Sequence, residues 1–225
     1  MKTFPELLER YQGRFAAELG IDVKAGPPER QKWFLAAILF GARISGTLAA
    51  RTYLVFMARQ VVTPEAILAQ GWDGLVALLD EGGYARYDFK TATKLLKVME
   101  SLQRDYQGSL ERLHQVSRDP DDLEARLRAL APGIGAATAN IFLRELRGVW
   151  PKANPPLSSL AQAAAVHEGF LPAGLSPEAA LQRLVELWQA QPVAGCDLAD
   201  LEAALVRQGL ELRRGERIKQ VGGGG

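Results

Sequence analysis

Residues 130–140, LAPGIGAATAN, place two glycines at the junction of two helical patterns. Before the junction, Leu123 and Leu127 share one helix face, and after it a second helical pattern runs to about residue 146. Glycine adopts backbone conformations with positive φ and has no side chain to keep neighbouring segments apart. Gly133 and Gly135 therefore predict a tight turn between two helices, and we call residues 130–135 the hairpin.

The start of the second helix offers backbone N–H groups to an anion. At this helix start, unpaired amides and the positive end of the helix dipole favour a phosphate. The residues that would contact it are Gly133, Ile134, Gly135, Ala136 and Thr138. Contacts of this kind position a protein on DNA without reading its sequence. The alternative is an ordinary corner between two helices, because Pro-Gly-x-Gly is common by chance.

The rest of the chain is helical in pattern, with no sustained alternation typical of strands. Residues 33–40 are apolar on all sides, which is typical of a central, buried helix. Thr63, Asp119, Ser176 and Asp197 stand at expected helix starts as N-caps. We predict an all-α fold.

Composition limits the class of protein. The chain has 225 residues, 48% hydrophobic and 24% charged, and a formal net charge of +1, so a folded globular protein is expected and any basic surface must be local. No apolar run reaches the roughly 18 residues that span a bilayer, and residues 1–15 lack an apolar signal core. We expect a cytoplasmic protein that is neither secreted nor bound to membranes.

Cys196 is the only cysteine, which excludes a disulfide or an all-cysteine iron–sulfur cluster within this chain. The two histidines, His114 and His167, lie far apart in sequence and predict no metal site; we interpret them as surface or capping residues. Core packing is the expectation for most of the four tryptophans, although Trp150 could alternatively line a base pocket.

Residues 133–139, followed about twenty residues later by the proline-rich loop 151–156, resemble the helix-hairpin-helix DNA glycosylase superfamily, the endonuclease III and adenine glycosylase group. Residues 34–43 look like the buried second helix and the lesion-facing loop of that family. Residues 82–84 look like its wedge loop, which enters the base stack, and residues 197–209 look like its closing helix.

The resemblance implies two helical domains with the active site between them. Residues 27–145 would form a six-helix barrel that contains the helix-hairpin-helix at about 123–145. Residues 1–26 and 146–220 would form the second domain. The partner implied is double-stranded DNA with a damaged base or an abasic site, bound by a monomer. Independently of the resemblance, four glycines after Val221 predict a flexible tail over 221–225.

Several single residues receive roles from the same resemblance. Tyr84 would insert into the base stack, with a buried core tyrosine as the alternative. Arg43 would fill the gap left by a flipped base, with a solvated or ion-paired arginine as the alternative. The backbone carbonyls of Ala129, Ala131 and Ile134 would hold a monovalent cation; no other cofactor is expected.

The chain departs from the family pattern at two positions. Ala137 stands where lyase-competent members have a lysine, so no Schiff base can form there. Asn154 best matches the position of the catalytic aspartate. Cleavage of an N-glycosidic bond builds positive charge on the sugar, which a carboxylate stabilises and an amide does not. Asn154 also suits a simple turn before two prolines.

These observations predict a monofunctional DNA glycosylase scaffold for base excision repair, which would flip a base but would be inactivated or divergent at Asn154. One alternative is a non-catalytic DNA-binding module for damaged or bent DNA, and another is an all-α protein-interaction domain. The basic stretch Arg207, Arg213, Arg214, Arg217 and Lys219 would either contact phosphates or form a solvated end.

Overall fold

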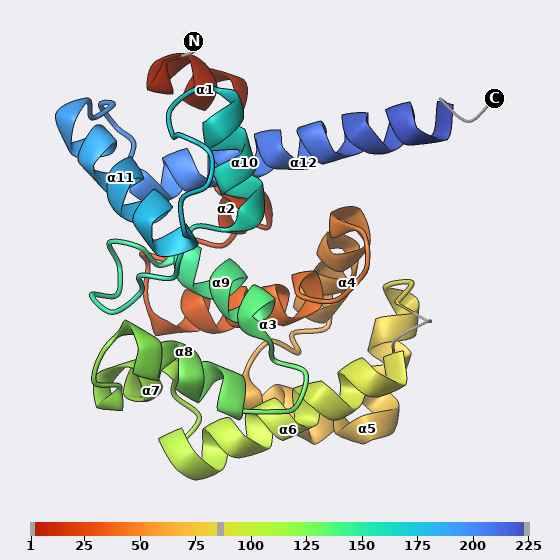
Figure 1. The fold of residues 1–225 in the computed structure, drawn as a ribbon. Coiled ribbons are helices and arrows are strands. Elements are labelled where there is room, and N and C mark those ends of the chain that lie inside the picture. Colours follow the sequence, from red (N-terminus) through yellow and green to blue (C-terminus); the bar gives the residue numbers. More distant parts are fainter. Residues whose placement is uncertain (1–2, 85–87, 223–225) are drawn as a thin grey trace. The chain divides into compact units, whose positions relative to one another are not determined.

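The computed structural model describes residues 3–84 and 88–222, with side chains up to residue 216. Within these residues the protein is all-helical and contains no strand, which confirms the predicted fold class (Figure 1). The helices in chain order are α1 (Phe4–Arg10), α2 (Phe15–Glu18), α3 (Pro27–Phe40), α4 (Gly46–Ala58), α5 (Pro64–Glu81), α6 (Asp88–Tyr106), α7 (Leu110–Val116), α8 (Pro120–Ala129), α9 (Ala136–Glu145), α10 (Ser159–His167), α11 (Pro177–Ala190) and α12 (Leu198–Gly222).

The chain divides into two compact units. The discontinuous unit contains residues 1–15 and 156–225, and the continuous unit contains residues 16–155. Segments 16–26 and 146–155, expected in the second domain, therefore belong to the continuous unit. Helix α12 extends to Gly222, so the first two residues of the expected tail are helical, and residues 223–225 lie outside the described chain.

Helix α3 is the centre of the continuous unit, where it contacts α4, α7 and α9. Residues 33–39 are fully buried, as their apolar pattern predicts. Trp33 donates its indole N–H to the carbonyl of Phe142 at 3.1 Å, and Phe34 packs edge-on against the Phe142 ring at 4.9 Å. These contacts fix α9, and with it the hairpin, against the central helix.

Side-chain caps define where most helices begin. The predicted caps Thr63, Asp119 and Ser176 each accept a backbone N–H three residues further on. Asp197 also caps, because its carboxylate accepts the amide of Ala199 just inside α12. One boundary was not visible in the sequence pattern: α5 contains a break at Gly71, whose φ is +64°.

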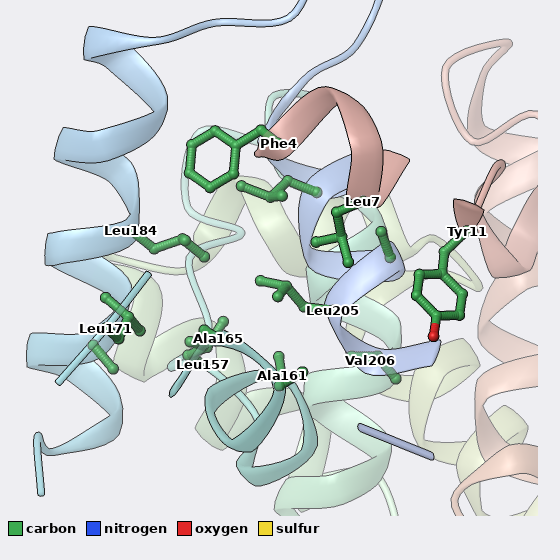
Figure 2. Close-up of a cluster of buried hydrophobic side chains, with 14 of the residues drawn as sticks. Phe4, Leu7, Tyr11, Leu157, Ala161, Ala165, Leu171, Leu184, Leu205 and Val206 are labelled. Atoms are coloured by element: carbon green, nitrogen blue, oxygen red, sulfur yellow. The ribbon is translucent and has the colours of Figure 1, made fainter. Parts of the chain in front are cut away.

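The discontinuous unit has its own apolar core (Figure 2). Side chains of α1, α10, α11 and α12 meet there, among them Phe4, Leu7, Ala161, Leu184 and Leu205. Helices α10 and α12 approach each other closely at Gly209, where a Cβ would collide with the carbonyl group of Leu160. The absence of a side chain at Gly209 permits this close approach.

Candidate nucleic-acid interface

The hairpin is a compact turn fixed by two buried side chains. Leu130 and Ile134 are 3% and 4% exposed, and the amide of Ile134 donates to the carbonyl of Ala131 at 3.1 Å. Gly133 has a φ of +93°, a conformation that favours glycine. Pro132 and Gly133 remain exposed. The two buried side chains thus anchor the turn to the core, while its tip faces solvent.

The start of α9 is open to an approaching group. Gly135 is its N-cap, with extended backbone at φ −97° and ψ 177°, and it provides no side-chain cap. A Cβ added at Gly135 would meet no atom within 4 Å, and Ala136 and Ala137 are exposed. The first-turn amides of α9 therefore lack the side-chain acceptor that Ser45, Thr63, Ser109 and Asp119 give to other helices of this unit.

Thr138 has a different role from the one expected. Its side chain is 2% exposed, and a Cβ added at Gly41 would collide with its hydroxyl oxygen. Thr138 thus packs the start of α9 against the end of α3. Its side chain is not available to DNA, because the whole residue is buried.

One cation lies directly beside the hairpin. A Cβ built on Gly133 would be 3.0 Å from Cε and 3.7 Å from Nζ of Lys94, on α6. Lys94 is half-buried and pairs with no acidic group among the described residues. Burial lowers the pKa of its amine from the usual value. An anion bound at the hairpin would stabilise the charged form of the Lys94 amine and raise its pKa again.

Asn154 lies in a loop that is held from within. The buried guanidinium of Arg147 donates from Nη1 to Oδ1 of Asn154 at 2.8 Å, and from Nη2 to the carbonyl oxygen of Pro155. Ala153 and Pro155 are buried on either side, while Asn154 itself is exposed. The loop after α9 therefore presents a fixed amide next to a fixed positive charge.

The base of this loop is closed by a second set of contacts. Lys152 donates from Nζ to the carbonyl of His114 at 2.9 Å. The His114 ring stacks on Trp150 at 4.6 Å and 6°, and Trp150 donates its indole N–H to Glu111 at 2.9 Å. Trp150 is 3% exposed and belongs to the core, so the base-pocket alternative is wrong in this structure.

The two histidines differ in position. His114 is half-buried rather than on the surface, because the Trp150 ring covers one of its faces. Burial and the neighbouring Lys152 lower its pKa. His167 is exposed at the end of α10, as expected.

Of the two residues expected at a flipped base, the structure leaves one accessible. Tyr84 is 1% exposed and its hydroxyl lies 3.5 Å from the carbonyl of Leu39, so the core alternative is correct and the ring cannot enter a base stack as it stands. Residues 85–87, which follow it, lie outside the described chain. Arg43 is exposed and has no ion pair with any described residue.

The C-terminal basic stretch is only partly on the surface. Arg213 and Arg214 are exposed on α12. Arg207 instead lies over the Phe15 ring at 4.3 Å and donates to the carbonyl of Gly13 at 3.1 Å, so it has a packing role. The side chains of Arg217 and Lys219 are outside the described set.

Sequence reasoning missed one exposed feature. Trp72 and Phe89 are 40% and 58% exposed, with ring centroids 5.2 Å apart. The available signal was the glycine before Trp72, together with the lysine after Phe89. We call these two residues the aromatic pair.

The described residues include no group of three or more metal-ligating side chains. None of the helices in the described chain is both long and apolar enough to span a membrane. No protein-family model matches this sequence, and no curated protein matches it at a significant level.

Proposed function

We propose that this chain binds double-stranded DNA through the hairpin and the start of α9. The observation that carries the proposal is the uncapped, unobstructed first turn of α9 at Gly135. A phosphate oxygen there can accept hydrogen bonds from the amides of this helix start, whose residues Ala136 and Ala137 are exposed, and gains from the helix dipole. Lys94 adds a positive charge beside the same turn.

The binding would be local, because the net charge of the whole chain is only +1. Arg43 is an exposed cation on the loop that follows α3, and Thr138 ties that end of α3 to α9. These groups favour contacts with phosphates or base edges from one side of the continuous unit. Counterion release then predicts an affinity that falls steeply with salt.

The resemblance adds a more specific proposal: a monofunctional scaffold for DNA base excision repair, acting as a monomer in the cytoplasm on damaged or abasic duplex. Ala137 supplies no amine for lyase chemistry. The Ala129, Ala131 and Ile134 carbonyls would complete the phosphate site with a monovalent cation. The Ala131 carbonyl already accepts the amide of Ile134, which leaves one lone pair for such an ion.

We further propose that base excision is slow or absent. An amide at Asn154 cannot act as a general base, and it offers only a dipole where positive charge develops on the sugar. The Arg147 guanidinium, 2.8 Å from the amide oxygen, opposes a second positive charge nearby. This contact favours the second candidate function, a non-catalytic module that binds damaged or bent DNA.

Gly135→Asp is the sharpest test of the hairpin. An aspartate at the N-cap accepts the first-turn amides and puts a negative charge where the phosphate would lie. The open space around Gly135 leaves room for it. We expect the melting temperature to stay equal or rise, while affinity for duplex DNA, measured by fluorescence anisotropy, falls at least about tenfold.

The matched control is Ala179→Asp, which adds the same charge to the exposed first turn of α11 in the discontinuous unit. It should leave DNA affinity within about twofold of the unmodified chain. Equal affinity of Gly135→Asp and Ala179→Asp would refute the phosphate contact at α9.

A further inference from the structure

The aromatic pair is held in a fixed arrangement on the surface. Its two rings are tilted at 36° with centroids 5.2 Å apart. Trp72 donates its indole N–H to the hydroxyl of Thr93 at 3.0 Å, and that hydroxyl donates to the carbonyl of Phe89 at 2.8 Å. The rings are therefore preorganised without being buried.

The backbone places both rings outward. Gly71 has a φ of +64°, which breaks α5 so that Trp72 begins its second helical part. Phe89 is the second residue of α6, where the side chain of Asp88 accepts its amide at 2.8 Å. Two helix starts thus present one aromatic ring each.

Lysines connect the aromatic pair to the hairpin along α6. Successive helical residues are rotated by about 100°. Around the α6 axis, Phe89 is followed by Thr93, then by the exposed Lys97 and Lys90, and then by Lys94 beside Gly133. The opposite side of α6 is buried, with Leu95, Val98, Met99 and Leu102 in the core. One exposed face of α6 therefore joins the rings, three lysines and the hairpin.

The chemistry of this face favours a nucleobase over an apolar protein surface. The other exposed large hydrophobic residues of the described chain, Leu54 and Val116, lie on α4 and α7, so the aromatic pair is not part of a broad apolar patch. Two rings beside lysines match a flat base attached to a phosphate backbone.

We propose that the aromatic pair stacks on an unpaired, unstacked base of DNA whose phosphates are bound at the lysines and the hairpin. The inference rests on the proposed DNA binding and deepens it. It assigns to Phe89 and Trp72 the contact that the buried Tyr84 cannot make.

The test compares two duplexes of equal length, one fully paired and one with a single bulged base, by fluorescence anisotropy. The unmodified chain should bind the bulged duplex more tightly. Phe89→Ala should weaken binding to the bulged duplex about tenfold and change binding to the paired duplex by less than about twofold. Phe89→Trp, which keeps a stacking ring, should retain the preference.

Leu54→Ala is the matched control, because Leu54 is similarly exposed at 53% but lies on α4. It should change neither affinity. The stacking proposal is overturned if Phe89→Ala keeps the bulge preference, or if it weakens both duplexes equally. If the unmodified chain binds neither duplex, DNA binding itself is refuted and the stacking proposal falls with it. Gly135→Asp should weaken binding to both duplexes, whereas Phe89→Ala should weaken binding to the bulged duplex only. This difference distinguishes a failure of the hairpin contact from a failure of the stacking contact.

Discussion

The two ends of α9 differ in whether side chains provide hydrogen-bond partners for the polar groups there. At its start, Gly135 provides no side-chain acceptor for the first-turn amides, and a Cβ at Gly135 would meet no atom within 4 Å. In the loop beyond its end, Arg147 fixes the Asn154 amide, and Lys152 fastens the same loop to the carbonyl of His114. The first region has no side-chain acceptor for its backbone N–H groups, whereas the loop of the second is held by side chains of the same unit. The proposed function therefore predicts that substitutions in the two regions change DNA binding and base release separately.

Asn154→Asp should have the largest effect, because it would give the loop after α9 a catalytic group. A carboxylate restores the charge that stabilises an oxocarbenium ion, an effect of about 10²–10⁴ in rate. We expect base release above that of the unmodified chain on at least one lesion, in single-turnover assays on alkylated, deaminated and oxidised duplexes. Rapid base release by the unmodified chain would place the catalytic group elsewhere, and an inert aspartate variant would support the binding-only function.

Arg147→Met should lower the stability of the protein without changing its affinity for DNA. Removing a guanidinium that is 5% exposed leaves the Pro155 carbonyl and the Asn154 amide without their donor. We expect a loss of about 2–3 kcal/mol in the free energy of unfolding, measured with urea. DNA affinity at a temperature where both proteins are folded should be unchanged, because the hairpin lies at the other end of α9.

Arg43→Met is the counterpart to that variant. Arg43 is exposed and has no ion pair among the described residues, so its loss should leave stability unchanged and weaken DNA binding severalfold. If the Arg147 variant lost DNA affinity and the Arg43 variant did not, the DNA contact would lie at the loop that holds Asn154 and not at the loop that holds Arg43.

Acidification should produce the smallest change in stability, through His114 beneath the loop that holds Asn154. Because the folded pKa of His114 lies below its unfolded value, the unfolded chain binds more protons. Stability should therefore fall as the pH drops below about 6.5, the usual histidine pKa. His114→Gln should reduce this slope in urea titrations at several pH values; an unchanged slope would show that other groups produce it.

Local patterns predicted the parts of the fold that depend on local chemistry. The turn at Gly133, the caps at Thr63 and Asp119, and the fully apolar helix α3 all follow from residue type and spacing. Each requires only neighbours in sequence, or burial on every side.

Exposure of single side chains was harder to predict because it depends on distant segments. Tyr84 has a glycine-flanked position typical of an exposed loop, yet it is buried next to the carbonyl of Leu39. Trp72 looked like a core residue, but the break at Gly71 turns it outward. The contact between Arg147 and Asn154 depends on the path of the loop, which seven residues of sequence do not specify.

The discontinuous unit has a consequence for the order of synthesis. Its core joins Phe4, Leu7 and Tyr11 to helices that begin after residue 156. The ribosome therefore makes the α1 side chains first and their partners last, with the whole continuous unit translated in between. During that interval α1 is an apolar segment without its native cover, which is the kind of surface that chaperones bind. Nascent-chain folding should accordingly proceed from the middle of this protein outward.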